Sequence, residues 1–230
     1  MNIALVLAAG SGTRMNSLNK PKQFVLIKDK PLMMYSIESF NHHPEIDAIV
    51  IVTSKDYVKY VQDLCQKHQL NKVKAVVIGG QTRQQSVFNG LKEIEKIISS
   101  EKDIVLIHDS ARPLVNDKII SNNILLCKKY GAVDTVIPAS DTIINSKDGE
   151  IIEGIPNRQE LYQSQTPQTF VFNIIKDAHL KALETMIPHV TDDCRLVKHF
   201  GIDVHLAEGS KQNFKITTDE DLELFKALVK

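Results

Sequence analysis

The sequence predicts a three-layer α/β fold with a mostly parallel central sheet, and three observations lead to this prediction. Strand-like and helix-like segments alternate along the chain, as they do when each strand is followed by a helix that crosses back over a parallel sheet. The strand-like runs are apolar throughout, which is typical of strands that helices cover on both faces. The 230 residues, 43% hydrophobic and 24% charged, are enough for one sizeable globular domain.

The elements follow in order from local patterns. Strands are expected where β-prone apolar residues run together, at 2–8, Ala48–Val52, Val73–Ile78, Ile104–Ile107 and Ala132–Pro138. Helices are expected between these runs, at Pro31 to about Phe40, 56–68, 82–98 and 117–129. Pro31 suits the first turn of its helix, because that turn needs no backbone N–H donor.

The pattern changes after Ala139, where two β-prone runs, Thr142–Asn145 and Glu150–Ile152, flank a short polar segment. That segment holds the pair Asp148-Gly149, and Asp-Gly between two such runs is a hairpin signal. We therefore expect a protruding β-hairpin arm at about 141–162. Because a lone hairpin has few internal contacts, we expect the arm to pack on a second subunit in a homodimer. An ordered surface hairpin on a monomer is the alternative.

Beyond the arm, the chain resumes with a helix, a strand at Val204–Leu206 and a final helix. Thr217–Glu220 has the pattern of a capping box, which marks the start of that last helix. The apolar face of this helix is expected to contain Leu222, Phe225, Leu228 and Val229. No repeat, low-complexity segment or linker divides the sequence, so residues 1–230 are predicted to form a single Rossmann-like domain from which the arm protrudes.

Composition excludes several classes of protein. The formal net charge is +0, so the charge balance gives no sign of binding to nucleic acid or to a membrane surface. No apolar run is long enough to cross a membrane, and the first strand starts too close to Met1 for a signal peptide to precede it. The three cysteines, Cys65, Cys127 and Cys194, lack C-x-x-C spacing, and the eight histidines lack metal-ligand spacing. The chain is therefore expected to be a reduced, cytoplasmic protein.

The turn after the first strand carries two glycines, Gly10 and Gly12, within the run Ala8–Met15. A strand that leads into a glycine turn leaves backbone N–H groups free to bind an anion, and glycine has no Cβ to keep a phosphate away. Arg14 and Lys22 follow closely and supply positive charge. The pattern predicts a nucleoside-triphosphate site built for chemistry on phosphate.

Other interpretations of this turn fit less well. A dinucleotide-binding fingerprint needs a third glycine where Met15 stands and an acidic residue about 20 positions further on, but the following segment is basic. A Walker A loop needs Gly-Lys-Ser/Thr, which is missing here. A Rossmann oxidoreductase is therefore the weakest alternative, and a plain strand-to-helix turn without a ligand is the remaining one.

Polar residues also gather where the other predicted strands end. Ligands of open α/β sheets bind beyond the carboxyl ends of the strands, so these residues are expected along one edge of the sheet. They are Gly79, Gly80, Gln81, Arg83, Ser86, the run His108–Pro113, Ser140, Asp141 and Thr142. Taken singly, Arg83 would be a solvated side chain at a helix start and Asp109 a cap of the next turn. Together they provide what a nucleotide, a metal and a second phosphate would need.

Seven motifs, in this order, resemble those of the cytidylyltransferases that activate polyol phosphates. They are Gly10–Met15, Pro21–Phe24, Gly79-Gly80 with Arg83 and Ser86, His108–Pro113, Asp141-Thr142, Gln165–Gln168 and Asn213–Thr217. The resemblance runs from Met1 to the last helix, and it implies a nucleotidyltransferase domain. The family includes methylerythritol-phosphate cytidylyltransferase of isoprenoid synthesis and ribitol-phosphate cytidylyltransferase of wall polymer (teichoic acid) synthesis.

The resemblance implies a reaction in which CTP and a polyol phosphate give a CDP-polyol and pyrophosphate. The polyol's phosphate attacks the α-phosphorus in line, which needs charge neutralisation more than a protein base. By resemblance, Arg14, Lys22 and Lys215 would be the catalytic cations, and Asp109 would hold Mg²⁺ or another divalent cation. Residues expected to bind the nucleotide are Ala8, Ala9, Gly10, Gly12, Gly80, Gln81 and Ser86.

The resemblance also assigns residues to the polyol phosphate, namely Arg112, Thr142, Arg158, Thr166 and Thr191. Arg158 lies on the returning side of the arm, so it is expected to reach into a partner's site, with an interface ion pair as the alternative. A non-catalytic nucleotide-binding relative would not need Arg14, Lys22, Asp109 and Lys215 together. A sugar-1-phosphate nucleotidyltransferase shares the opening motifs but lacks Gln165–Gln168 and the surroundings of Arg158.

Residues that differ between the two branches of the family favour D-ribitol 5-phosphate as the acceptor. The methylerythritol branch typically has lysine where Ile144 stands, aspartate where Asn157 stands and tryptophan where Tyr162 stands. Thr191–Cys194 also resembles the ribitol branch, whereas Ala8–Gly10 resembles the other. The alternative acceptor is 2-C-methyl-D-erythritol 4-phosphate.

Overall fold

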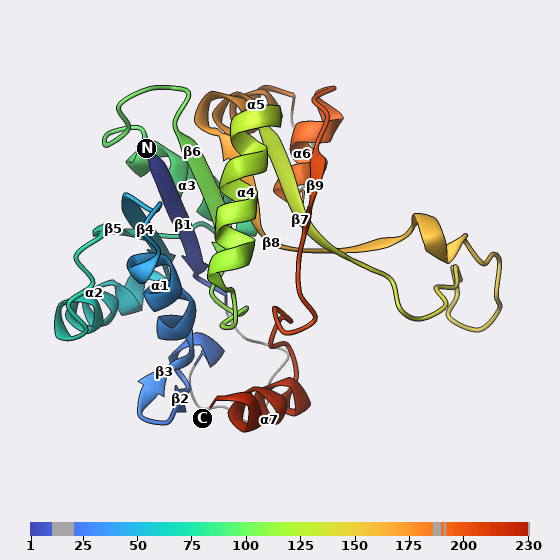
Figure 1. Ribbon diagram of the computed structural model, residues 1–230, viewed down its shortest axis with the longest axis horizontal. Helices are drawn as coiled ribbons and strands as arrows, with labels where there is room; N and C mark the ends of the chain where they lie inside the picture. Colours follow the sequence, from blue (N-terminus) through green and yellow to red (C-terminus); the bar gives the residue numbers. More distant parts are fainter. Residues whose placement is uncertain (11–20, 186–189, 191, 230) are drawn as a thin grey trace.

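The computed structural model describes residues 1–10, 21–185, 190 and 192–229 (Figure 1). Within these residues, seven strands form one sheet in the order β5-β4-β1-β6-β8-β7-β9. The strands are β1 (Asn2–Ala8), β4 (Ala48–Thr53), β5 (Val73–Ile78), β6 (Ile104–Asp109), β7 (Ala132–Pro138), β8 (Tyr162–Val171) and β9 (His205–Glu208). Neighbouring strands pair in parallel except for β8, which runs antiparallel to β6 and to β7. The prediction of a mostly parallel central sheet is confirmed.

Helices cover both faces of this sheet and complete the three predicted layers (Figure 1). One face carries α1 (Leu32–His42), α2 (Val58–Lys67) and α4 (Asp117–Tyr130), and the other carries α3 (Arg83–Ile94), α5 (Phe172–Glu184) and α6 (Asp193–His199). Along β1, Ala4 and Val6 pack with the first set, while Ile3 and Leu5 pack with the second. The shorter elements and the last helix are β2 (Leu26–Ile27), β3 (Lys30–Pro31), η1 (Lys22–Phe24), η2 (Lys55–Tyr57), η3 (Arg158–Glu160) and α7 (Asp219–Leu228).

The strand β8 was not predicted from the sequence. Its centre, Gln165–Gln168, is polar and contains Pro167, which cannot donate a ladder hydrogen bond and is therefore rare in central strands. The structure accommodates it with an irregularity, because the register of β7 with β8 shifts between Asp134 and Val136. Pro167 lies where this ladder is interrupted, and it pairs with no residue of β6 or β7.

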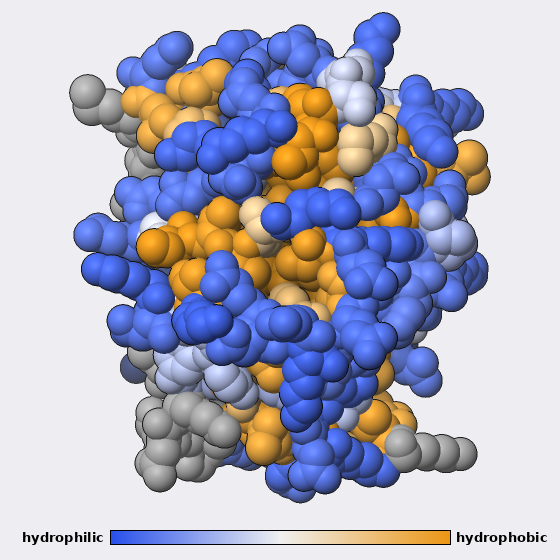
Figure 2. All heavy atoms as spheres, turned by 90° about the vertical axis from the view of Figure 1, so that its left-hand side faces the viewer, coloured by the Kyte–Doolittle hydropathy of each residue, from blue (hydrophilic) through white to orange (hydrophobic). Residues whose placement is uncertain are grey.

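The strand β5 lies at one edge of the sheet, and the molecular surface on this side is apolar in its middle (Figure 2). Figure 2 looks onto this side of the molecule and shows apolar residues across the middle of the face, with polar residues around them. Ile78 is 49% exposed, and Val76 and Val77 are half-buried. Lys74, the second residue of this edge strand, is an exposed charge that opposes edge-to-edge pairing with another chain.

The arm protrudes from the domain as predicted (yellow in Figure 1), but the two strands expected to form it are reduced to a single β-bridge. That bridge joins Asn145 and Gly154. The turn between them forms around Asp148, whose carboxylate accepts hydrogen bonds from the N–H groups of Glu150 and Ile151. The ladder does not extend, because two short strands without a third strand or a packed face are only marginally stable.

The last helix, α7, has a capping box that lies one residue later than predicted. Thr218, and not Thr217, is the N-cap, and Asp221 completes the box in place of Glu220. Leu222 and Phe225 are buried in a small cluster beside β2, as expected for the apolar face. Leu228 is instead 42% exposed, because the helix ends at this residue and its side chain extends past the cluster.

The helices in the described part of the chain are too short or too polar for any of them to span a membrane. The three cysteines are buried free thiols. Burial raises the pKa of Cys65 to about 11 and that of Cys127 to about 12, so both stay protonated and unreactive at neutral pH.

Asp134, on β7, is a buried carboxyl group that makes stability depend on pH. It is 9% exposed and accepts hydrogen bonds from Ser164 Oγ and Gln168 Nε2. Burial raises its pKa from 3.8 to about 6, although these hydrogen bonds act in the opposite direction. The folded state therefore holds this proton more tightly than the unfolded chain does. The resulting stabilisation is full below a pH of about 4 and is lost as the pH rises through about 6.

We expect the Asp134→Asn variant, which is neutral at every pH, to be more stable than the wild type at pH 8 by up to about 3 kcal/mol. The gain should shrink steadily as the pH falls toward 4. Urea unfolding of both proteins across this range measures it, and a gain independent of pH would contradict the assignment.

Candidate active site

A pocket of about 380 Å³ opens at the carboxyl ends of β1 and β6, at the edge of the sheet where the polar residues were predicted to gather. Its walls come from the end of β1, η1, the start of α3, the residues after β6 and the segment before α7. The residues of the predicted site that line it are Ala8, Ala9, Gly10, Lys22, Gly80, Gln81, Ser86, Asp109 and Lys215.

The turn after β1 is held in place by η1. Gln23 is buried, and its Nε2 donates hydrogen bonds to the backbone oxygens of Ala8 (2.8 Å) and Gly10 (2.9 Å). The preceding residue, Lys22, reaches the pocket, where its Nζ donates to the backbone oxygen of Ile216 at 2.5 Å. The same short element therefore shapes the glycine turn and presents a cation beside it.

The opposite wall is the turn between β5 and α3. Thr82 is the N-cap of α3 and accepts a hydrogen bond from the N–H of Gln85 at 3.1 Å. Ser86 Oγ accepts from the N–H of Gly80 (3.0 Å) and donates to the backbone oxygen of Thr82 (2.9 Å). This turn has no room for a side chain at Gly80, because a Cβ there would lie 2.2 Å from Cβ of Gln85.

We expect the Gly80→Ala variant to displace this turn and to weaken nucleotide binding about tenfold, the effect of 1.4 kcal/mol, within the range that overpacking costs. Isothermal titration with CTP measures the loss. Gly154→Ala is the matched control, because a Cβ at Gly154 would meet nothing closer than 3.9 Å. Equal affinities of the two variants would contradict the tight fit at Gly80.

The segment before α7 is fixed at two points. The buried Asn213 donates through Nδ2 to the backbone oxygen of Thr166 at 2.9 Å. The N–H of Ile216 donates to the backbone oxygen of Ala111 at 2.8 Å. Lys215 lies between these two anchors, so the fold delivers its ammonium group to the pocket from a distant part of the chain.

Asp109, the last residue of β6, provides the acidic group among the described lining residues. Its Oδ2 lies 2.6 Å from Lys215 Nζ, and its Oδ1 lies 3.4 Å from Arg83 Nε. Burial alone would raise the pKa of Asp109, but the two cations outweigh burial and hold the pKa below its usual range. The carboxylate therefore stays ionised at neutral and mildly acidic pH.

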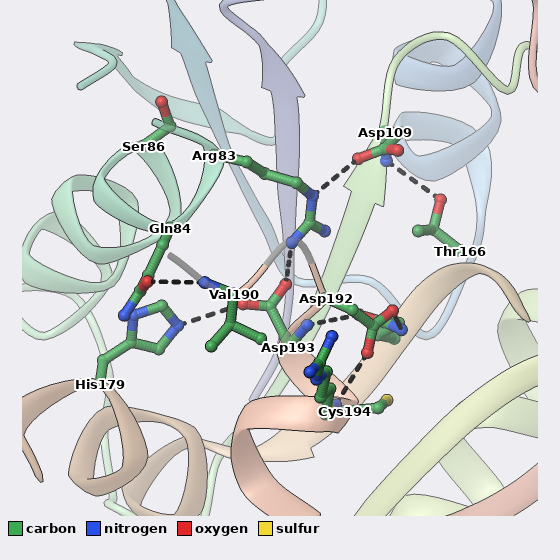
Figure 3. Close-up of polar contacts among 12 residues, drawn as sticks. Arg83, Gln84, Ser86, Asp109, Thr166, His179, Val190, Asp192, Asp193 and Cys194 are labelled. Atoms are coloured by element: carbon green, nitrogen blue, oxygen red, sulfur yellow. Dashed lines mark hydrogen bonds and ion pairs between the residues drawn. The ribbon is translucent and has the colours of Figure 1, made fainter. Parts of the chain in front are cut away.

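Arg83, the first residue of α3, lies between two carboxylates (Figure 3). Besides its contact with Asp109, its Nη1 lies 2.5 Å from Oδ2 of Asp193, whose side chain is 3% exposed. Asp193 also binds Nε2 of the buried His179 at 3.1 Å. Burial would lower the pKa of Arg83, but Asp193 and Asp109 together raise it above its usual value. The guanidinium therefore stays charged.

Thr166 lies behind Asp109 instead of lining the pocket (Figure 3). Its Oγ1 accepts from the N–H of Asp109 and lies 3.1 Å from Nδ1 of His108. The other ring nitrogen of His108, Nε2, lies 3.0 Å from the backbone oxygen of Arg112, which can only accept. Nε2 therefore carries the proton and Thr166 donates to Nδ1. Burial lowers the pKa of His108 to about 4, so the ring is neutral in this network.

The other residues expected to bind the polyol phosphate lie away from the pocket lining. Arg112 donates to the backbone oxygens of Asn213 (2.8 Å) and Ser164 (3.3 Å). Thr142 is exposed on the arm, and Arg158, also exposed, donates through Nη1 to the backbone oxygen of Ser140 at 3.1 Å. Gly12, Arg14 and Thr191 lie outside the described residues. The structure thus brings the described nucleotide residues together at the pocket. Of the described polyol residues, Arg112 and Thr166 both contact His108, while Thr142 and Arg158 lie on the arm.

Two residues of the site received no role in the sequence analysis. Arg83 was placed at the predicted edge of the sheet, with a solvated side chain as the alternative, but nothing showed that it would link Asp109 to Asp193. Gln23 was seen within the Pro21–Phe24 motif but received no role, because nothing local shows that its amide closes the β1 turn.

The pocket sets three cations, Lys22, Arg83 and Lys215, against one carboxylate among its described lining residues, so it suits an anion with several phosphate oxygens. Within residues 1–10, 21–185 and 192–229, no group of three or more His, Cys, Asp and Glu side chains could hold a metal by itself. A single carboxylate, Asp109, nevertheless fits Mg²⁺ that arrives with phosphates. Mg²⁺ takes one or two carboxylates and completes its shell with phosphate oxygens and water.

The chain resembles known proteins over its full length. Residues 2–230 match the family described as 2-C-methyl-D-erythritol 4-phosphate cytidylyltransferase. A protein of that name from Clostridium botulinum (strain Langeland) is 44% identical over 221 residues, which cover 96% of this chain and 94% of the relative. A ribitol-5-phosphate cytidylyltransferase from Vibrio parahaemolyticus is 38% identical over 229 residues, covering 100% and 96%. The crystal structure of 4-diphosphocytidyl-2C-methyl-D-erythritol synthase from Anaerococcus prevotii matches with a TM-score of 0.84 at 28% identity, covering 99% and 95%.

Proposed function

The chain belongs to the 2-C-methyl-D-erythritol 4-phosphate cytidylyltransferase family and is a cytidylyltransferase, and on this premise we propose that it transfers CMP from CTP to 2-C-methyl-D-erythritol 4-phosphate. The observation that carries the proposal is the pocket in which Lys22, Lys215 and Asp109 meet beside the turn after β1. Fixed cations beside the backbone at the end of a strand are what a triphosphate needs.

The proposed reaction forms one bond and breaks one. A phosphate oxygen of the acceptor attacks the α-phosphorus of CTP, the bond from that phosphorus to the oxygen bridging the β-phosphate breaks, and pyrophosphate leaves. The attacking oxygen is already anionic, so no protein base has to remove a proton. Lys22 and Lys215 act as point charges that stabilise negative charge on the triphosphate as the bond breaks. Arg14, outside the described residues, is proposed as a third cation.

We infer that Asp109 is the protein ligand of Mg²⁺ or another divalent cation. When bound, the metal neutralises charge on the phosphates. The contribution of the chain is to keep this carboxylate ionised, because Arg83 and Lys215 hold its pKa below the usual range. We expect the backbone of Ala8–Gly10, together with Gly80, Gln81 and Ser86, to hold the nucleotide.

We also infer that the arm packs on a second copy of the chain. Ile144, Ile151 and Ile155 are 49%, 66% and 61% exposed, and an apolar surface on a protruding segment is typical of an interface. Such packing would carry Arg158 and Thr142 to the partner's pocket, where the acceptor phosphate needs a cation and a hydroxyl. Light scattering after size-exclusion chromatography tests this inference, which predicts a dimer that Ile151→Lys converts to a monomer.

The choice of acceptor depends on the comparisons. The Clostridium botulinum relative is 44% identical and carries the methylerythritol name, whereas the Vibrio parahaemolyticus relative with the ribitol name is 38% identical. D-ribitol 5-phosphate remains the second candidate, because the Vibrio relative matches 100% of the chain.

Pyrophosphate release with CTP and Mg²⁺ tests the proposal when the two acceptors are compared at equal concentrations. We expect a higher kcat/KM with 2-C-methyl-D-erythritol 4-phosphate. A higher kcat/KM with D-ribitol 5-phosphate would establish the second candidate instead, and release with neither would refute both acceptors.

We expect the enzyme to act in the cytoplasm. Cys65, Cys127 and Cys194 are buried and form no disulfide, which is usual for proteins of a reducing compartment.

A further inference from the structure

A chain of polar contacts links a buried pair on α5 and α6 through Arg83 to Asp109 (Figure 3), and from Asp109 to a second cation of the pocket. His179 Nε2 binds Asp193 Oδ1 at 3.1 Å, and Asp193 Oδ2 binds Arg83 Nη1 at 2.5 Å. Arg83 Nε lies 3.4 Å from Asp109 Oδ1, and Asp109 Oδ2 binds Lys215 Nζ at 2.6 Å. We call these five residues the polar chain; it crosses from the interior to the pocket and ends on Lys215.

We propose that Arg83 is a positioning residue, which acts through Asp109 to keep Lys215 available to the triphosphate. The proposal rests on the proposed function, because it assumes that the pocket binds CTP. The single negative charge of Asp109 is shared between two cations, one on each oxygen. Without Arg83, Asp109 and Lys215 would form an exclusive ion pair, and the triphosphate would have to overcome that stronger attraction before it could contact Lys215.

The interior of the protein sets the position of Arg83. Its contact with Asp193 is shorter than its contact with Asp109, and Asp193 is the more buried carboxylate. Asp193 is fixed in turn, because its N–H donates to Gln168 Oε1 at 3.1 Å and its Oδ1 accepts from His179. Arg83 is therefore held by Asp193 through Nη1 and offers Nε to the pocket carboxylate.

Arginine is needed for this task, because Nε and Nη1 are separate donors on one rigid plane and can serve two carboxylates at once. The single ammonium group of lysine would reach one carboxylate at a time. The Arg83→Lys variant is therefore expected to behave like Arg83→Gln in nucleotide binding, although it keeps the charge.

A purely structural role of Arg83 has to be separated from the proposed one. Removal of Arg83 alone leaves Asp193 as a buried charge without its cation, which destabilises the fold whatever happens in the pocket. The Arg83→Gln variant is therefore made together with Asp193→Asn, so that both charges of the buried pair disappear. We expect this double variant to unfold within a few degrees of Asp193→Asn alone, and its CTP affinity then reports on the pocket.

The decisive measurement is the dissociation constant of CTP, determined by titration calorimetry in the absence of acceptor. In the Asp193→Asn background, we expect Arg83→Gln to weaken CTP binding about tenfold, a coupling typical of residues in one ion-pair network. In a background that also carries Lys215→Ala, the same change should alter the dissociation constant of CTP by less than about twofold, because Arg83 affects the nucleotide only through Lys215. Lys118→Gln, which breaks the exposed Lys118–Glu208 pair, is the control and should leave the affinity unchanged.

Equal weakening with and without Lys215 would overturn the proposal, because Arg83 would then act on CTP independently of Lys215. Full affinity of the Arg83→Gln, Asp193→Asn variant would overturn it as well, and so would full CTP affinity of Arg83→Lys in a protein that keeps Asp193. A wild-type protein that does not bind CTP would refute the proposed function along with this inference, whereas the other outcomes leave the proposed function intact.

Discussion

Replacing Lys22 with alanine is expected to lower kcat for pyrophosphate release by about 10²–10³-fold, the loss that follows removal of one preorganised group that stabilises charge in a transition state. Lys22 is presented to the pocket by η1, whose position is fixed by the hydrogen bonds of Gln23 to the β1 turn. The substitution removes the ammonium group without disturbing those bonds. Circular dichroism and thermal unfolding should therefore show a folded protein.

Lys59→Ala is the matched control, because the side chain of Lys59 is 82% exposed on α2, away from the pocket. Its kcat should equal that of the wild type. A Lys22→Ala enzyme with nearly normal kcat would show that the charge of Lys22 is not used in the reaction, and the cationic role would then fall to Lys215 and Arg14.

Asp109→Asn is expected to have an effect of similar size, with a loss in kcat/KM of about 10²–10³-fold. Asparagine has nearly the same shape, but it removes the negative charge that faces Lys215 and Arg83 and provides a weaker ligand for a divalent cation. The concentration of Mg²⁺ needed for half-maximal activity should therefore rise. Binding of Mn²⁺ to the CTP complex, followed by electron paramagnetic resonance, checks the same loss without turnover.

The matched control for Asp109→Asn is Asp134→Asn, the same chemical change at a buried carboxyl group that does not line the pocket. This control should keep its turnover and its Mg²⁺ dependence. If Asp109→Asn left the binding of Mn²⁺ unchanged, Asp109 would be a partner of Lys215 and Arg83 alone and not a metal ligand.

The parallel strands were predictable because their signal is local. Strands buried on both faces are apolar throughout, and β1, β4, β5, β6 and β7 appear in the structure within about two residues of the predicted ends. For β8 the signal is not local. Thr166 and Gln168 are polar because they bind His108, the Asp109 N–H and Asp134, which belong to other strands and cannot be located from neighbouring residues.

The site was predictable to the extent that strand ends meet at one edge of a sheet. That rule predicted that Gly80 and Asp109 lie beside the turn after β1, and the resemblance added Lys215 to the site. The rule could not show that Arg83 would contact Asp193, since the two are 110 residues apart and meet only because α3 and α6 cover the same face of the sheet. Nor could it show that Thr166 would turn behind Asp109, because its direction depends on the bulge beside β7.

The place of β8 in the sheet also determines when the enzyme can become active during its synthesis. Within the described residues, β6 and β7 are consecutive strands of the sheet in the chain, but they lie on opposite sides of β8, which joins β5-β4-β1-β6 to β7-β9. A nascent chain that ends before residue 162 therefore contains β7 but lacks the strand that joins β7 to β6. The same strand supplies Thr166, which holds the backbone of Asp109 from behind. The addition of β8 thus completes the sheet and supports the pocket carboxylate at the same time. We therefore expect ribosome-bound chains to bind CTP only after the residues beyond β8, up to Lys215, have emerged.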